Sequence, residues 1–244
     1  MIKHSLIAAI LSALIVSFSS QAMAVIDESK YNEKEKVGFA FHILANIQPD
    51  FEIWTKNSKK YIDANPIDKI DILQNDYYRL SQGYINYEPD ENFIDIRQKF
   101  MLKKQREFTG KDGVNYFSIN MTPKYPAHMS IGNISFSYFP VKIGELWIAL
   151  IILDAHKYQN IFFANEHYYN KLTDSLLMGK EGAVSANVGY LLQPVSVDLN
   201  EPLIINGKEL WPMLTKVKKV TIRDNREKSI LWEENAPWHL SLIH

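Results

Sequence analysis

An uninterrupted apolar run from Leu146 to Leu153 constrains the fold of this chain more than any other segment. The run contains no charged residue and is followed by Asp154. A membrane-spanning helix needs about 20 apolar residues, so this run is too short to cross a bilayer. Short runs of Ile, Leu and Trp are typical of strands that are buried on both faces. The run therefore predicts the central strand of a sheet.

The start of the chain has the layout of a secretory signal peptide. Lys3 supplies a positive charge, residues 5–18 are almost wholly apolar, and Ala22-Met23-Ala24 is a small-x-small cleavage site. We expect residues 1–24 to be removed after Ala24, giving an exported protein, periplasmic or secreted. An uncleaved membrane anchor is the alternative. Because no cysteine follows the cleavage point, a lipoprotein anchor is excluded.

The composition is that of a globular protein, with 46% hydrophobic and 23% charged residues in 244. The formal net charge of −1 gives no support for nucleic-acid binding, which needs a strongly basic surface. The absence of cysteine excludes disulfides and thiolate zinc sites, so stability in an oxidising compartment must come from the core.

Residues 25–110 are predicted to be mainly helical. Apolar residues recur at helical spacing over residues 37–47 and 51–62, and Asn65-Pro66 indicates the start of a further helix that Gly83 ends. One stripe of that helix comprises Ile67, Ile70, Leu73, Tyr77 and Leu80. A charged segment over residues 90–107 has Phe93, Arg97, Phe100 and Lys104 at helical spacing and is interpreted as one more helix.

Residues 111–244 are predicted to be rich in strands, either as a second domain or as one domain with the helices. Strands are expected over 115–120, 134–139, 146–153, 183–192 and 203–205, with a short strand and a helix inserted over 162–178. Pro194 is expected to interrupt the strand before it. Asn206-Gly207 predicts a hairpin, and residues 216–223 and 229–233 predict a second. The fold class is therefore α+β, with helices first and a mostly antiparallel sheet after them.

The order of these segments resembles a family of exported bacterial proteins of unknown function. The resemblance rests on the charged segment near residues 90–107, the strands at 134–141 and the strand-helix-strand passage through 162–188, and it covers residues 90–232. It implies no activity, and no residue roles are carried over from it.

Polar residues capable of catalysis follow the apolar run. Asp154 and His156 lie on one face if the strand continues, and Glu166 and His167 follow a few residues later. Imidazole and carboxylate groups suit a divalent metal or an acid–base pair, so these four residues are the candidate catalytic residues, and His156, Glu166 and His167 are the candidate metal ligands. The alternative is that they cap turns or face water. His42, in an apolar helix, is interpreted as a core residue.

Other functional signals are weaker. The chain has no His-Glu-x-x-His pattern, no Gly-x-Ser-x-Gly elbow and no phosphate-binding loop, so no cofactor is predicted. The basic residues of 216–228 are interpreted as an edge hairpin kept soluble by lysine, with an anionic surface as the alternative. Most of the tyrosine residues fit core faces. The sequence favours a non-catalytic binding protein that contacts an envelope protein or component, and the alternative is a metal-assisted or acid–base hydrolase.

Overall fold

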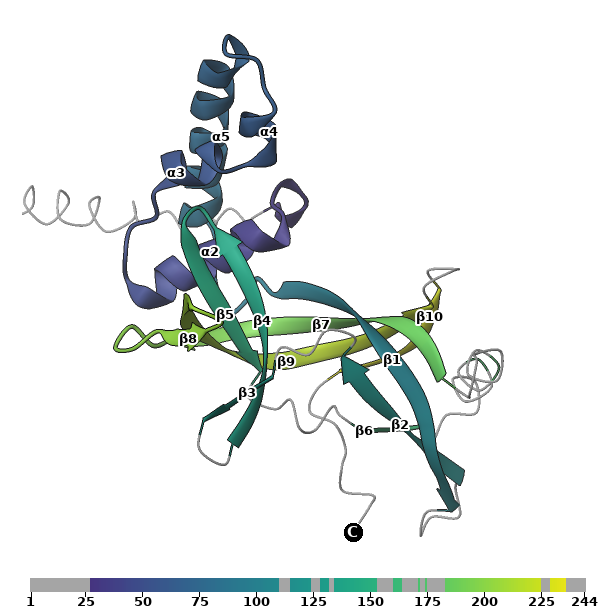
Figure 1. Cartoon of the computed structure of the whole chain (residues 1–244). Coiled ribbons are helices and arrows are strands. Elements are labelled where there is room, and N and C mark those ends of the chain that lie inside the picture. The colour runs from purple at the N-terminus through teal and green to yellow at the C-terminus, as the bar shows by residue number, and fades with distance from the viewer. Residues whose placement is uncertain are drawn as a thin grey trace, which may run out of the picture.

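The computed structural model describes residues 27–109, 115–123, 128–131, 134–152, 160–163, 171, 174, 183–224 and 229–235. Helices occupy residues 28–85 and strands most of the remaining described residues, so the described chain combines helices with a mixed sheet, which agrees with an α+β fold. Figure 1 shows the helices gathered over one end of a twisted sheet. The predicted signal peptide and most of the predicted inserted helix lie outside the described residues, and both stay predictions.

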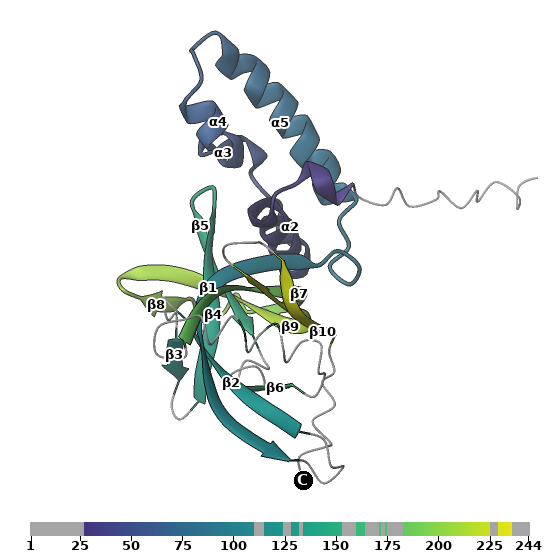
Figure 2. The ribbon, with the colours of Figure 1, turned by 90° about the vertical axis from the view of Figure 1, so that its right-hand side faces the viewer.

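The helical layer lies on one face of the sheet, with α2 closest to the strands (Figure 2). Helices α3 to α5 stand beyond α2, farther from the sheet (Figure 2). The order and bounds of the elements are η1 Glu28–Lys30, α2 Glu33–Ala45, α3 Phe51–Lys56, α4 Lys59–Ile62 and α5 Asp68–Ile85.

Side-chain caps set the starts of three of these helices. At the start of α2, the Asn32 side chain accepts a hydrogen bond from the Glu35 N–H, and the Glu35 carboxylate accepts one from the Asn32 N–H. The Asp50 and Ser58 side chains cap α3 and α4 by accepting hydrogen bonds from the N–H groups of Ile53 and Tyr61. Such caps provide partners for N–H groups that a helix leaves unpaired at its first turn. The predicted second helix is therefore two short helices separated by the Ser58 cap.

The described strands form a ten-stranded sheet in the order β3-β4-β5-β9-β7-β1-β2-β6, with β8 and β10 also paired to β9. Strands β5 and β9 run parallel, and the other described pairs are antiparallel. The bounds are β1 Ile94–Thr109, β2 Asn115–Pro123, β3 His128–Ile131, β4 Ile134–Ile143, β5 Leu146–Ile152, β6 Asn160–Phe163, β7 Ala183–Val197, β8 Leu203–Ile205, β9 Lys208–Asp224 and β10 Ile230–Asn235.

The apolar run that dominates the sequence is confirmed as a buried strand, β5. Ile148, Leu150 and Ile152 face the main core under the helices, and Ala149 and Ile151 face a smaller apolar cluster on the opposite side of the sheet. Its central position is not confirmed, because the middle of the sheet is formed by β9 and β7. These two strands are longer than β5, and they pair with each other along most of their length.

The predicted helix over residues 90–107 is wrong, because β1 begins at Ile94. Ile94, Phe100 and Leu102 lie at even positions and are buried, whereas Arg97 and Lys99 between them are exposed. Burial with a period of two is the pattern of a strand. Strands β7 and β2 pair with β1 on either side, and this pairing outweighs the charge-rich composition.

Three further predictions concern turns and pairing. The Asn206-Gly207 hairpin is confirmed, and both residues have positive φ, 52° and 73°. Strand β7 continues through Pro194 with a register shift between Pro194 and Ser196, which accommodates a residue that lacks an N–H. The β9–β10 pair is confirmed, but its interpretation as an edge hairpin is wrong because β9 also pairs with β7 and β5.

Candidate functional site

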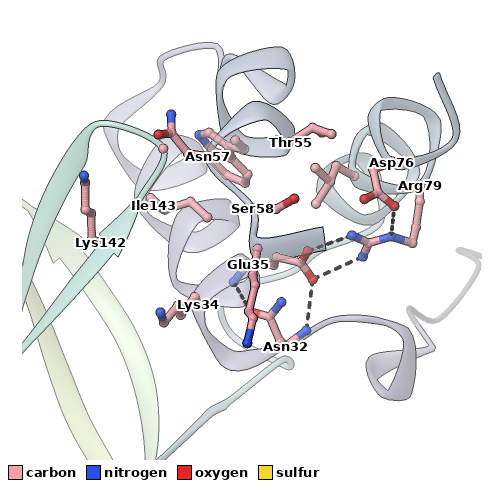
Figure 3. Close-up of a pocket in the computed structure, with 14 residues that line it drawn as sticks. Asn32, Lys34, Glu35, Thr55, Asn57, Ser58, Asp76, Arg79, Lys142 and Ile143 are labelled. Atoms are coloured by element: carbon pink, nitrogen blue, oxygen red, sulfur yellow. Dashed lines mark hydrogen bonds and ion pairs between the residues drawn. The ribbon is translucent and has the colours of Figure 1, made fainter. Parts of the chain in front are cut away.

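A cavity of about 240 Å³ lies where the helical layer meets the tip of the β4–β5 hairpin. Its walls come from the N-terminus of α2, the turn between α3 and α4, the middle of α5, and the hairpin residues Lys142, Ile143 and Gly144 (Figure 3). The cavity therefore brings together segments that are far apart in the sequence.

A network of ion pairs forms one wall of the cavity. Arg79 donates from Nη1 and Nη2 to the two carboxylate oxygens of Glu35, at 3.1 and 2.7 Å, and Figure 3 shows these side chains pointing toward one another. Arg79 Nε and Lys60 Nζ donate to Asp76 Oδ1 at 3.4 and 3.1 Å. Hydrogen bonding to Glu35 raises the pKa of Arg79 above its ordinary value. Both carboxylates of this wall are thus already paired with cations.

Trp54 contributes a buried hydrogen-bond donor to the cavity. Its side chain is 6% exposed and lies among the rings of Phe39, Phe51 and His42. The five-membered ring edge, with Cδ1 and Nε1, faces Gly144, another residue of the cavity wall. Within the described part of the chain, the Trp54 indole N–H has no hydrogen-bond acceptor. Buried donors without a partner are rare and costly in folded proteins.

The remaining polar groups of the cavity are mostly donors. The Ser58 hydroxyl accepts a hydrogen bond from the Tyr61 N–H, which leaves its own hydrogen available. Asn57 Nδ2 donates to the Ile53 carbonyl and has a second hydrogen. The exposed side chains of Lys34 and Lys59 form no ion pair with any residue that the structure describes.

A second candidate surface is the outer face of α5. Ile67, Ile70, Tyr77, Tyr78 and Ile85 are 86%, 65%, 52%, 69% and 71% exposed. At 3.6 residues per turn these residues lie on one side of the helix, and we call them the α5 apolar face. The sequence stripe that includes Ile67, Ile70 and Tyr77 is therefore correct as a helical pattern. Tyr77 is half exposed and its ring also contacts Phe51, with 5.9 Å between the ring centroids, so it lies at the border between this face and the core.

The four residues predicted as a catalytic or metal site, Asp154, His156, Glu166 and His167, lie outside the described residues. Among the residues that are described, no group of three or more His, Cys, Asp or Glu side chains is placed to hold a metal ion. His42 is buried and its Nδ1 lies 2.8 Å from the Gly38 carbonyl oxygen, so its interpretation as a core residue is confirmed.

The cavity residues carry no functional signal in the sequence. The Asn32-x-x-Glu35 spacing before an apolar run is a recognisable capping box, and it predicts that the Glu35 side chain is held at the start of a helix. Arg79 is 44 residues away from Glu35, and no local pattern predicts that these two side chains meet. The burial of Trp54 depends on the same long-range packing.

The chain matches no protein-family model, no curated protein and no solved structure. In the described part of the chain, no helix has the length and apolar content needed to span a membrane.

Proposed function

We propose that this is an exported, non-catalytic binding protein of the cell envelope that contacts a partner protein through the α5 apolar face. The exposure of this face carries the proposal. Monomeric proteins rarely expose large contiguous apolar patches, and such patches commonly mark interaction sites. Figures 1 and 2 show α5 extending away from the sheet, where a partner has access to it.

The spacing of the exposed residues suits recognition by a groove in another protein. Ile67 and Ile70 are three residues apart, and Ile70 and Tyr77 are seven apart, as are Tyr78 and Ile85. Amphipathic helices that bind in apolar grooves present anchors at these intervals. Tyrosine adds large contact area together with a hydroxyl group that tolerates partial hydration.

The chemistry of the face favours a protein over an anionic membrane. Gln74 and Ser81, which lie between the apolar anchors, are uncharged. Helices that bind anionic lipid surfaces carry Lys and Arg beside their apolar face. Of the two basic residues of α5, Arg79 is paired with Glu35 and Asp76, and Lys69 Nζ lies 5.1 Å from the Tyr61 ring centroid.

Cross-linking in intact envelopes tests this proposal, with Ile70→Glu as the disrupting variant. Ile204→Glu is a matched control, because Ile204 lies in β8 and is also 65% exposed. A charge placed in an apolar interface is expected to reduce the cross-linked complex about tenfold or more, whereas the control retains it. Circular dichroism of both purified variants checks that the helices are intact.

Two outcomes contradict the proposal. Equal cross-linking of Ile70→Glu and Ile204→Glu shows that the α5 apolar face is not the contact surface. A cross-linked species with twice the mass of the chain and no other protein shows that the face pairs two copies instead of binding a different partner.

Export is tested separately by fractionation and mass measurement. We expect the protein in the periplasmic or secreted fraction, with a mass that corresponds to a chain starting at Val25. A full-length chain retained in the cytosol or inner membrane contradicts this part of the proposal. The hydrolase alternative that uses Asp154, His156, Glu166 and His167 stays a prediction.

A further inference from the structure

We propose that the cavity between the helical layer and the β4–β5 hairpin binds a small anion through a carboxylate or phosphate group, with the Trp54 indole N–H as its buried donor. This site is separate from the α5 apolar face and does not depend on the function proposed for that face.

The Trp54 indole N–H is a buried donor without an acceptor among the described residues. The Trp54 side chain is 6% exposed, and its Nε1 edge lies beside Gly144 in the cavity wall. A buried N–H without an acceptor destabilises a fold, so a protein retains one where a ligand or an ordered water supplies the acceptor. The Ser58 hydroxyl and the Asn57 amide each have a hydrogen left to donate into the same region.

The walls of the cavity carry more positively than negatively charged side chains. The lining contains four cations, Lys34, Lys59, Lys142 and Arg79, against two carboxylates, Glu35 and Asp76. Arg79 and Lys60 already pair with the two carboxylates, so an entering cation meets no unpaired carboxylate among these lining residues. Lys34 and Lys59 have no ion-pair partner in the described ranges, and an anion gains from their proximity.

The hairpin tip is shaped to leave the indole edge open. Gly144 has φ +58°, and a Cβ atom there would lie 2.9 Å from Trp54 Cδ1. Glycine thus lets the backbone approach the ring closely without covering Nε1 with a side chain. The cavity volume of about 240 Å³ suits a small anion with part of its hydration shell.

Other ligand classes fit less well. An apolar ligand would cover the Trp54 N–H without offering an acceptor, and this costs binding free energy. A cationic ligand would be repelled by the excess of lysine and arginine in the lining. An anion, unlike a neutral acceptor, interacts favourably with both the hydrogen-bond donors and the positive charge of the cavity lining.

Isothermal titration calorimetry on the full chain tests the proposal, with inorganic phosphate and acetate as separate probes at constant ionic strength. We expect saturable one-site binding of at least one probe, and comparison of the two distinguishes a phosphate site from a carboxylate site. Trp54→Phe removes the N–H while keeping an aromatic ring, and Lys59→Gln removes one exposed cation. Each is expected to weaken the affinity roughly tenfold. Lys99→Gln, an exposed lysine on β1, is the matched control and is expected to bind as the unmodified chain does.

The outcomes are decisive in both directions. Binding that is weakened by Lys59→Gln and unchanged by Lys99→Gln supports the site even if Trp54→Phe proves too unstable to measure. No saturable binding of either probe, or equal affinity in all three variants, shows that the cavity holds only water and overturns the proposal.

Discussion

Gly38 in α2 and Trp54 in α3 are in such close contact that a Cβ atom on Gly38 would lie 2.4 Å from Trp54 Cη2. The opposite edge of the same indole faces Gly144 at the tip of the β4–β5 hairpin. One tryptophan side chain therefore fits between a helix and a hairpin, each of which presents a glycine to it. This packing connects the helical layer to the sheet beside the cavity.

We expect Gly38→Ala to destabilise the fold by about 2 kcal/mol, because the new methyl group overlaps the Trp54 ring. Helix propensity alone predicts the opposite sign, a gain of about 1 kcal/mol. Urea denaturation measures the difference. The control is Gly189→Ala, where the nearest atom to the new Cβ is Asp95 Oδ1 at 3.4 Å, an ordinary contact distance. Equal or higher stability of Gly38→Ala would contradict this account of the packing.

The β8–β9 hairpin offers a test of backbone conformation without steric contact. Gly207 has φ +73°, and a Cβ atom there would have no neighbour within 4 Å. We expect Gly207→Ala to cost about 1 kcal/mol in unfolding free energy, because residues with a Cβ disfavour positive φ. Thermal or urea denaturation measures it. An unchanged stability would mean that the turn adopts another conformation in solution.

The ion pair between Glu35 and Arg79 is expected to contribute measurably to stability. Their side chains are 13% and 30% exposed, so solvent screening reduces the interaction only in part. A double-mutant cycle with Glu35→Gln and Arg79→Gln is expected to give a coupling energy of about 1 kcal/mol. The more exposed pair of Glu52 and Lys56 serves as the comparison, with an expected coupling below about 0.5 kcal/mol. Equal coupling in the two pairs would argue against a special role for the Glu35–Arg79 pair.

His42 is expected to make stability dependent on pH. Burial lowers the pKa of His42 in the folded protein, and the hydrogen bond to the Gly38 carbonyl raises it by less. In the unfolded chain the histidine pKa is about 6.5, so above that pH His42 is neutral in both the folded and the unfolded state. Below it, the unfolded state binds a proton that the folded state excludes, and stability falls as the pH decreases toward the lowered folded pKa. Urea midpoints between pH 7.5 and pH 5 measure the slope, which should be smaller in His42→Gln. An equal slope in this variant would assign the pH dependence to other groups.

Local patterns in the sequence predicted several elements correctly because short-range chemistry decides them. The run of Ile and Leu in β5 can satisfy its apolar side chains only by burial. Asn206-Gly207 forms the turn because both residues tolerate positive φ. The helical spacing over residues 37–47 and 67–80 corresponds to α2 and α5.

The error at residues 90–107 shows where local patterns are insufficient. Phe93, Arg97, Phe100 and Lys104 have helical spacing, and Ile94, Phe100 and Leu102 have strand spacing, so both structures agree with the same segment. Two neighbouring strands, β7 and β2, supply backbone hydrogen-bond partners along β1, and this pairing selects the strand over the helix. Those partners come from parts of the chain that a local window does not include.

The cavity and the exposure of the α5 apolar face depend on tertiary contacts, whereas the local elements that form them can be predicted from the sequence. The sequence by itself determined that residues 67–80 are helical, that residues 146–152 are buried, and that residues 206–207 turn. The tertiary structure decided which side of α5 packs, so that Leu80 is buried while Ile67 and Ile70 are exposed. It also brought Glu35, Trp54, Arg79 and Gly144 to one place. The physical reason is that periodicity and turn preference act over a few residues, whereas burial and ion pairing depend on neighbours distant in the chain.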